Sequence, residues 1–205
     1  MAVKGLSFSM SKSLENHLRK QSQIADAARK LFLENGYAST GMDTVAKEAG
    51  VTKQTVYRYF PSKEELFQHI IKSMSEKQAA YTFGSRGVLE ELIHYGEDLI
   101  LYHIQPQRLE FWRLMVAEGG KGGSIGKMFR EINQTTRKTP LINYLRDSLN
   151  MSDPEKLADM YCSMLLYTRP QILMGSADVP DAEAVRDHAQ LSAEIFVNGL
   201  LSLKI

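Results

Sequence analysis

The segment MDTVAKEAGVTKQTVYRYFP, residues 42–61, restricts the fold of this chain more than any other feature. It holds two short stretches with helical spacing of apolar residues, separated by Gly50. A helix-turn-helix needs a small residue where its helices cross and a turn residue that tolerates unusual backbone angles. Ala46 meets the first need, and Gly50, four residues later, meets the second. The order of these residues predicts a helix-turn-helix. Its interior would be filled by Val45, Ala49, Val51 and Val56.

Capping residues stand at the expected start of several helices in this region. Side-chain oxygens of Thr, Ser and Asp accept hydrogen bonds from the first backbone N–H groups of a helix, and Gly or Pro commonly ends one. The helices predicted here span residues 22–35, 40–49, 53–60 and 63–81. The caps of the last three are predicted to be Thr40 with Asp43, Thr52, and Ser62 with Glu65.

The helix predicted over 53–60 has one apolar face. Val56, Tyr59 and Phe60 are spaced i, i+3, i+4, so this face should be buried. The polar side would then face outward, and the N-terminal end of such a recognition helix meets base edges in the major groove. Lysine suits guanine acceptors, glutamine suits adenine, and threonine suits the thymine methyl, while tyrosine and lysine can also bind phosphates. The predicted DNA-contacting residues are Thr40, Thr52, Lys53, Gln54, Thr55, Tyr57, Arg58, Tyr59 and Lys63.

The stretch ARKLFLENGYASTGMDTVAKEAGVTKQTVYRYFPSKEELF resembles the DNA-binding region of the TetR/AcrR repressors over about residues 22–68. Its G-Y-x-x-T, A-x-x-A-G-V and Y-x-Y-F-x-S-K-E-x-L pieces occur in the family's order. The resemblance implies an all-helical homodimer with a three-helix DNA-binding head and a divergent body that dimerises through its last two helices. It also implies a cavity between the body helices, whose occupation by a small molecule releases operator DNA.

The body shows a weaker likeness. The stretch FWRLMVAEGGKGGSIGKMFREINQ is similar to the regulatory domain of AefR-like members, although GGKGG at 119–123 departs from the Pro-containing turn expected there.

Apolar residues recur at helical spacing in the rest of the chain, so the predicted fold is all-α. We expect a flexible N-terminal arm over 1–17, a helix-turn-helix domain over 18–65, and a ligand-binding and dimerisation domain over 66–205. Pro170 lies inside one predicted body helix, where it should kink the chain and free a carbonyl near Leu166. The predicted body helices span 86–104, 106–119, 124–149, 154–176 and 182–203.

Aromatic, methionine and polar residues in the body could line an adaptable apolar pocket, and they could equally form the core of a helical bundle. The candidate ligand-binding residues are Tyr95, Leu99, Tyr102, His103, Phe111, Trp112, Met115, Phe129, Met164, Tyr167, Thr168 and Gln171.

The helix predicted over 182–203 carries apolar residues on more than one face. A monomer could not bury all of this apolar surface. With 154–176 it is the expected dimer interface, for which Met160, Met164, Leu173, Ala189, Ile195, Phe196 and Leu200 are candidates. A two-fold dimer would set two recognition helices on an inverted-repeat operator.

Composition bounds the remaining possibilities. Residues 1–79 carry 12 Lys/Arg against 8 Asp/Glu in a chain of net charge +1, and a basic head suits DNA. No apolar run is long enough to span a membrane, no secretory signal is evident, and the single cysteine fits a reducing cytoplasm. Five histidines show no metal-ligand spacing, and Cys162 has no nucleophile–base arrangement, so we expect no enzyme, metal or cofactor.

Three alternatives to a ligand-released repressor remain. An activator would use the same head, a regulator could sense oxidants through Cys162, and an interaction protein could use the fold without binding DNA.

Overall fold

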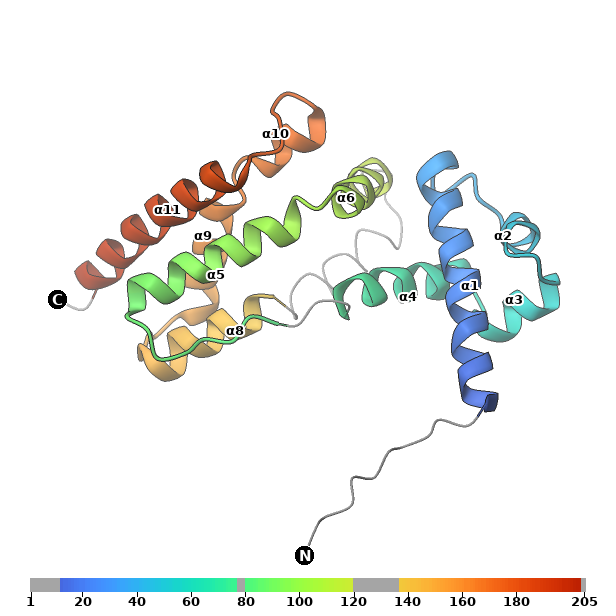
Figure 1. Ribbon diagram of the computed structural model, residues 1–205, viewed down its shortest axis with the longest axis horizontal. Coiled ribbons are helices and arrows are strands. Elements are labelled where there is room, and N and C mark those ends of the chain that lie inside the picture. The colour runs from blue at the N-terminus through green and yellow to red at the C-terminus, as the bar shows by residue number, and fades with distance from the viewer. Residues whose placement is uncertain (1–11, 77–79, 120–136, 204–205) are drawn as a thin grey trace, which may run out of the picture. The chain divides into compact units, whose positions relative to one another are not determined.

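The computed structural model describes residues 12–76, 80–119 and 137–203 (Figure 1). All regular secondary structure in these ranges is helical, as predicted. The chain divides into two compact units, with the boundary between Met74 and Ser75. We refer to them as the head and the body.

The head contains α1 (Lys12–Asn35), α2 (Met42–Glu48), α3 (Lys53–Tyr59) and α4 (Lys63–Glu76). Helix α1 begins ten residues before the predicted start at residue 22, so residues 12–17 are helical and the expected arm over 1–17 is wrong for them. Leu, Glu and Lys in this stretch favour helix, although the stretch lacks the apolar stripe that periodicity detects. Residues 1–11 of the expected arm lie outside the described residues. Helix α4 is described through Glu76, and the predicted end at Tyr81 is wrong because residues 80 and 81 are not helical.

The core of the head joins all four helices. Ile24, Ala28 and Phe32 of α1 are fully buried, together with Val45 of α2 and Val56 of α3. Helix α4 adds Leu66, Phe67 and Ile70. The rings of Phe32 and Phe67 meet edge to face at 5.6 Å, and Tyr37 packs against both. This apolar cluster fixes α3 in place.

Two turns in the head require positive φ angles. Gly36 (φ 81°) follows α1, and Gly50 (φ 61°) connects α2 to α3, as the helix-turn-helix pattern predicts. Thr52 caps α3 by accepting a hydrogen bond from the Thr55 N–H at 3.2 Å. Ser62 accepts from the Glu65 N–H at 3.1 Å, which is half of the predicted capping box.

The predicted cap at Thr40 is wrong. Gly41 stands at the N-cap of α2 and makes no side-chain capping bond. The Thr40 hydroxyl is buried and lies within hydrogen-bonding distance of the carbonyls of Leu31 (3.2 Å) and Gly36 (2.9 Å). It therefore satisfies the C-terminal end of α1 instead of starting α2.

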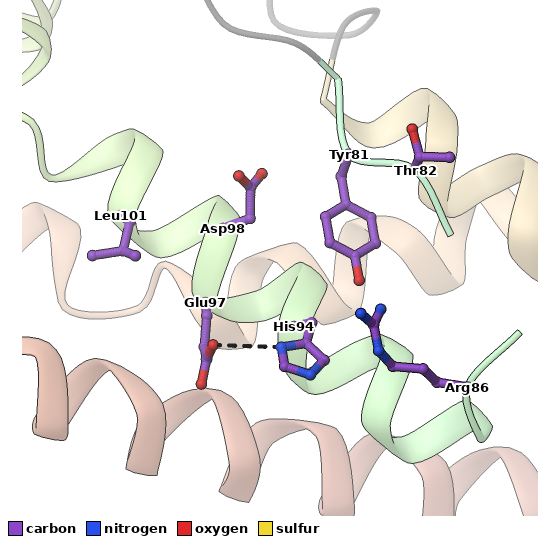
Figure 2. A pocket seen from close by; sticks show the side chains of 7 residues that line it. All are labelled: Tyr81, Thr82, Arg86, His94, Glu97, Asp98 and Leu101. Atoms are coloured by element: carbon purple, nitrogen blue, oxygen red, sulfur yellow. Dashed lines mark ion pairs between the residues drawn. The ribbon is translucent and has the colours of Figure 1, made fainter. Parts of the chain in front are cut away.

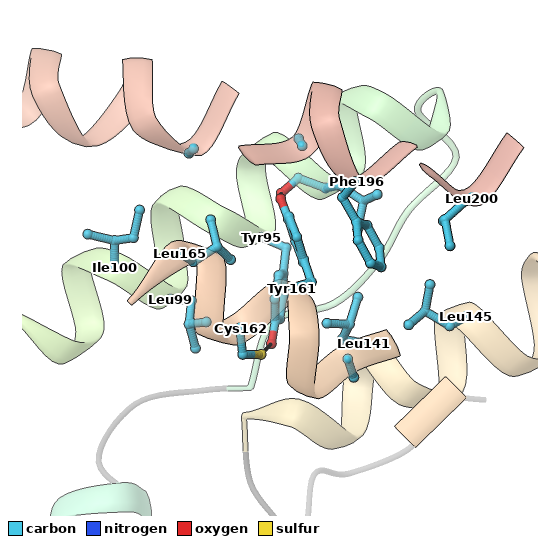
Figure 3. Packing of buried hydrophobic residues seen from close by; sticks show 14 of the residues in the cluster. Tyr95, Leu99, Ile100, Leu141, Leu145, Tyr161, Cys162, Leu165, Phe196 and Leu200 are labelled. Atoms are coloured by element: carbon cyan, nitrogen blue, oxygen red, sulfur yellow. Dashed lines mark hydrogen bonds between the residues drawn. The ribbon is translucent and has the colours of Figure 1, made fainter. Parts of the chain in front are cut away.

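The body consists, in its described residues, of helices packed around a core on α5. Figure 3 shows side chains of α5, α8, α9 and α11 that converge on this core. Tyr161 stacks on Phe196 with ring centroids 4.6 Å apart, and its hydroxyl donates to the Leu92 carbonyl at 2.9 Å. The elements are α5 (Val88–His103), α6 (Pro106–Gly119), α8 (Lys138–Asn143), the π-helical turn η1 (Tyr144–Ser148), α9 (Pro154–Leu165), α10 (Arg169–Met174) and α11 (Ala182–Leu203).

Gly96 lets α5 approach α9 and α11 closely. A Cβ atom at this position would lie 2.9 Å from Leu165 Cδ2, 3.2 Å from Ala189 Cβ and 3.3 Å from the Tyr161 hydroxyl. A side chain at this position would force the Leu165 side chain and its neighbours to shift.

The helix predicted over 154–176 is wrong as a single element. Helix α9 ends at Leu165, and α10 starts at Arg169 with Pro170 in its first turn. Proline is tolerated there because the first turn needs no intrahelical N–H. The Leu166 carbonyl is not freed, because it accepts from the Arg169 N–H at 3.1 Å. The first part of the helix predicted over 124–149 lies outside the described residues, and the described remainder is α8 followed by η1.

Candidate functional site

Helix α3 has an exposed side formed by Lys53, Gln54, Tyr57 and Arg58, which we call the recognition face, and an apolar side that is buried. Val56 is fully buried and Phe60, directly after the helix, is 3% exposed. The Thr52 cap and the turn at Gly50 set the start of the helix. The opposite side of α3 is therefore presented to solvent in a fixed orientation.

Four long side chains project from this outer side. Lys53, Gln54, Tyr57 and Arg58 are exposed, as predicted, and Tyr57 leaves 41% of its surface in solvent. Thr55 is half-buried, and its hydroxyl lies 2.8 Å from that of Thr52. An exposed tyrosine among amide and cationic groups forms a surface that suits a DNA duplex. These side chains can donate hydrogen bonds both to bases and to phosphates.

Lys53 has a partner that sequence reasoning missed. Its ammonium lies 2.8 Å from Asp43 Oδ1, and the hydrogen bond and charge of that carboxylate raise the pKa of Lys53 above its usual range. Both side chains are exposed, so the pair is weak and can open. The i, i+10 separation across the turn gave no local signal for it.

Two of the predicted DNA-contacting residues use their side chains for hydrogen bonds within the protein. Thr40 is 2% exposed with its hydroxyl turned inward, so its side chain is not available to a phosphate. The half-buried Lys63 donates to the carbonyls of Tyr37 (2.8 Å), Ala38 (3.3 Å) and Thr40 (3.0 Å). Lys63 thus closes the loop between α1 and α2.

The start of α1 adds side chains beside α3 that were not among the predicted DNA-contacting residues. The ring of Tyr59 lies 4.7 Å from that of His17, and the guanidinium of Arg58 lies 5.4 Å from the Tyr59 ring. Tyr59 is half-buried. These residues border an open hollow of about 600 Å³, which is lined by Ser13, Asn16, His17, Arg19, Lys20, Arg58 and Tyr59.

In the body, the first two ligand candidates belong to the core. Tyr95 and Leu99 are almost fully buried in the cluster of Figure 3. The Tyr95 hydroxyl donates to the Arg137 carbonyl at 3.0 Å and lies 3.5 Å from Cys162 Sγ. Burial raises the pKa of the Cys162 thiol to about 11, so it stays protonated at neutral pH. A protonated thiol reacts slowly with oxidants, which disfavours a redox sensor at Cys162.

Three further candidates meet arginines that the sequence did not single out. The guanidinium carbons of Arg108 and Arg137 lie 3.5 Å and 3.9 Å from the Tyr102 ring centroid. Arg169 lies 4.1 Å from the Trp112 ring, and its Nη1 is 3.2 Å from His103 Nδ1. Since arginine only donates, the His103 Nδ1 accepts, and its proton is on Nε2.

The remaining ligand candidates are scattered. Phe111 and Met115 are buried in α6, whereas Met164, Thr168 and Gln171 are half-buried. Tyr167 is 58% exposed and its ring lies 4.9 Å from His188. Phe129 lies outside the described residues.

The body also carries a surface pocket of about 470 Å³ that was not predicted (Figure 2). Glu91, fully buried, lies next to its lining. Burial opposes ionisation of Glu91, but bonds from the Arg86 and Gly84 N–H groups and the Tyr81 hydroxyl outweigh it and lower the pKa. The pocket is lined by Tyr81, Thr82, Arg86, His94, Glu97, Asp98 and Leu101.

Two features are absent from residues 12–76, 80–119 and 137–203. No helix in these ranges is long and apolar enough to cross a membrane. The same ranges contain no group of three or more His, Cys, Asp or Glu side chains arranged to hold a metal ion.

Two family models cover most of the chain. Residues 24–70 match bacterial regulatory proteins of the tetR family, and residues 90–199 match the C-terminal domain of AefR-like transcriptional repressors. The first match includes the helix-turn-helix, and the second includes α9 and most of α5 and α11.

Individual relatives match over part of the chain. The HTH-type transcriptional regulator YhgD of Bacillus subtilis (strain 168) is 48% identical over 58 residues, which are 26% of this chain and 30% of YhgD. The HTH-type transcriptional activator FasR of Mycolicibacterium smegmatis is 32% identical over 106 residues, 48% of either chain. The chain thus covers less than half of the length of these curated relatives.

Solved structures match over nearly the whole length. The Flavonoid-responsive Regulator FrrA superposes with a TM-score of 0.77 and 28% identity, covering 88% of this chain and 96% of that chain. A TetR-family regulator from Mesorhizobium loti has the same fold, with a TM-score of 0.72 at 23% identity over 89% of this chain and 96% of that chain. The chain belongs to the TetR family of transcriptional regulators, with a body of the AefR-like type.

Proposed function

We propose that this protein is a repressor of the cytoplasm that binds an inverted-repeat operator as a homodimer and releases it when a small molecule occupies the body. The observation that carries the proposal is the recognition face, where Gln54, Tyr57 and Arg58 project from a helix whose opposite face is buried. Side chains of these kinds, on a helix held in one orientation, can read bases and bind phosphates.

The domain division of the proposal follows the two compact units. The head supplies the DNA contacts, and the body supplies the effector site and the dimer interface. The head extends through α4 to Met74, beyond residue 65 where the sequence placed the end of the DNA-binding domain.

Exposed apolar residues on α11 and α9 support a homodimer. Leu191, Ile195 and Leu201 of α11 are each more than half exposed, as is Met160 of α9. The other side of α11 packs in the protomer core, where Ala189, Phe196 and Leu200 are buried. These three residues are therefore removed from the interface candidates. A face with this much apolar surface is typical of a protein–protein contact.

A small-molecule effector is supported by the relative FrrA, whose name describes it as flavonoid-responsive. Candidate residues around the rings of Tyr102 and Trp112 in this chain offer both aromatic and hydrogen-bonding groups. Binding sites of such mixed character are common for small organic ligands.

Selection from a random DNA pool tests the DNA-reading part. Purified full-length protein would be incubated with the pool at about 0.15 M salt, where non-specific binding is weak. We expect enrichment of an inverted repeat whose half-site centres are about 34–36 Å apart or a near multiple. A folded dimer that enriches no sequence, before and after removal of bound ligand by unfolding and refolding, would refute the proposal.

Activation is the second candidate, because FasR is described as an activator. Transcription with purified RNA polymerase would be measured on templates that carry the selected operator over, or upstream of, the promoter. A repressor lowers transcript from the first template and leaves the second unchanged. An increase from the second template would instead establish an activator.

A further inference from the structure

Three arginines from separate elements gather in the body around two aromatic rings. Arg108 lies on α6, Arg137 directly precedes α8, and Arg169 begins α10. Arg108 and Arg137 both contact the Tyr102 ring, and Arg169 contacts the Trp112 ring. We call these three residues the arginine cluster.

The cluster brings positive charges close together. Arg137 pairs with Asp98, whose carboxylate oxygen lies 2.6 Å from Arg137 Nη1. Burial and the three neighbouring guanidinium groups lower the pKa of His103 to about 3, so His103 is neutral and adds no charge. Burial also lowers the pKa of Arg108 and Arg169. Like charges held together out of water are costly unless something neutralises them.

Arg137 has an unused hydrogen-bonding edge. Its side chain is only 8% exposed, and its Nε and Nη2 atoms are buried without a hydrogen-bond partner in the described residues. These two N–H groups point in parallel from one edge of the guanidinium, which is the geometry that receives a carboxylate or phosphate through two hydrogen bonds. Leaving such donors buried and unpaired is destabilising, so native structures supply an acceptor for them.

We propose that the arginine cluster binds the anionic head group, carboxylate or phosphate, of the small organic effector. The inference rests on the proposed function, because it names the chemical class of the molecule that the body senses. Arg137 receives two oxygens of the head group through Nε and Nη2. Arg108 and Arg169 add positive charge from α6 and α10, so one anion links three elements that are distant in the sequence.

The experiment compares one alkyl chain on three head groups. Octanoate, octyl phosphate and 1-octanol, with inorganic phosphate as a fourth probe, would be titrated into the full-length protein by calorimetry at constant ionic strength. We expect octanoate or octyl phosphate to bind and to raise the melting temperature, while octanol binds at least about tenfold more weakly. The acid that binds more tightly identifies the preferred head group. Binding of inorganic phosphate would show that the anion is sufficient for binding without the alkyl chain.

Arg137→Gln should weaken the acid by at least about tenfold, and Arg137→Lys should do so as well because it keeps the charge without the two-pronged edge. Arg146→Gln is the matched control, since exposed Arg146 pairs with Glu155 outside the cluster. If Arg137→Gln fails to fold, Arg169→Gln takes its place. The inference is overturned if octanol binds as well as the acids, if neither acid binds, or if the cluster variants bind like the wild type.

Operator binding by the same preparation separates the two proposals. A protein that binds its selected operator but is indifferent to both acids refutes the arginine cluster as an effector site and leaves the regulator intact. A protein that selects no operator refutes the proposed function, whatever it does with acids.

Discussion

The exposed side chains of α3 differ in the part of DNA that they can bind. Gln54 has an amide that can both donate and accept, so it can distinguish one base from another. Arg58 near the end of the helix is a cation beside the ring of Tyr59, and phosphates are its natural partners. The two residues are one turn apart on the same exposed side.

Gln54→Ala and Arg58→Gln should therefore differ in kind. Gln54→Ala is expected to change the preferred base at one operator position at a cost of about 1–3 kcal/mol. Arg58→Gln should weaken binding to all DNA sequences about equally, and it should reduce the slope of log K against log salt concentration by about one. Fluorescence anisotropy with operator variants at several salt concentrations measures both effects. Identical profiles for the two variants would contradict this division.

His103 makes the stability of the protein depend on pH. Its pKa is about 3 in the folded protein and 6.5 when unperturbed, so protonation below 6.5 favours the unfolded chain. The stabilising contribution is complete above pH 6.5 and falls as the pH decreases toward 3.

Lowering the pH from neutral to about 5 should cost the wild type about 2 kcal/mol through this residue. His103→Gln should lose most of that acid sensitivity, and His94→Gln, at an exposed histidine, should keep it. Urea unfolding at the two pH values provides the measurement. Equal acid sensitivity in wild type and His103→Gln would show that His103 does not titrate in this range.

At the scale of helices, Gly96 is a position of close packing between α5, α9 and α11. The Cβ of alanine would come within 3.0 Å of Leu165 in α9 and close to Ala189 in α11. Gly199, within α11, has no atom near its virtual Cβ in the protomer.

Gly96→Ala should destabilise the protein by about 1–3 kcal/mol through overpacking. Gly199→Ala should be neutral or stabilise it by up to about 1 kcal/mol, because alanine favours helix. Chemical denaturation followed by circular dichroism compares the two. A stable Gly96→Ala protein would mean that α5 can move away from α9 at little cost.

The helices show where sequence reasoning succeeds. The Gly50 turn, the Thr52 cap and the helix over 182–203 follow from local residue types, and all three were predicted correctly. The early start of α1 was missed because residues 12–21 are helical without an apolar stripe. Pro170 was given the interior of a helix, although it stands in the first turn of α10 where proline is acceptable.

The candidate sites include contacts that could not be predicted from the sequence. The exposed residues of α3 could be named because a single helix repeat determines them. The inward turn of Thr40 and the capture of Lys63 by loop carbonyls depend on how the chain folds back. The arginine cluster joins residues 108, 137 and 169, and neither spacing nor composition brings these positions together.

For the whole molecule, the proposed dimer depends on the apolar face of α11. Ile195 is 55% exposed on a helix whose other side is buried. A charge placed there would have to be desolvated in a dimer, and it costs nothing in a free monomer.

Ile195→Glu is expected to weaken the dimer by about 2–4 kcal/mol, which is roughly 30- to 1,000-fold in Kd. Val179→Glu, at an exposed apolar residue before α11, should leave it intact. Light scattering over a range of protein concentrations measures the change. A wild-type protein that is monomeric at micromolar concentration would refute the dimer itself.

The place of Trp112 has a practical consequence. It is the only tryptophan among the 205 residues, and the guanidinium of Arg169 lies against its ring. Excitation at the red edge of the absorption band, where tyrosine contributes little, therefore reports on one location in the molecule. Any event that displaces Arg169 alters the quenching and polarity at the indole. The protein thus contains its own optical probe of the arginine cluster, and it can be followed in real time without a label.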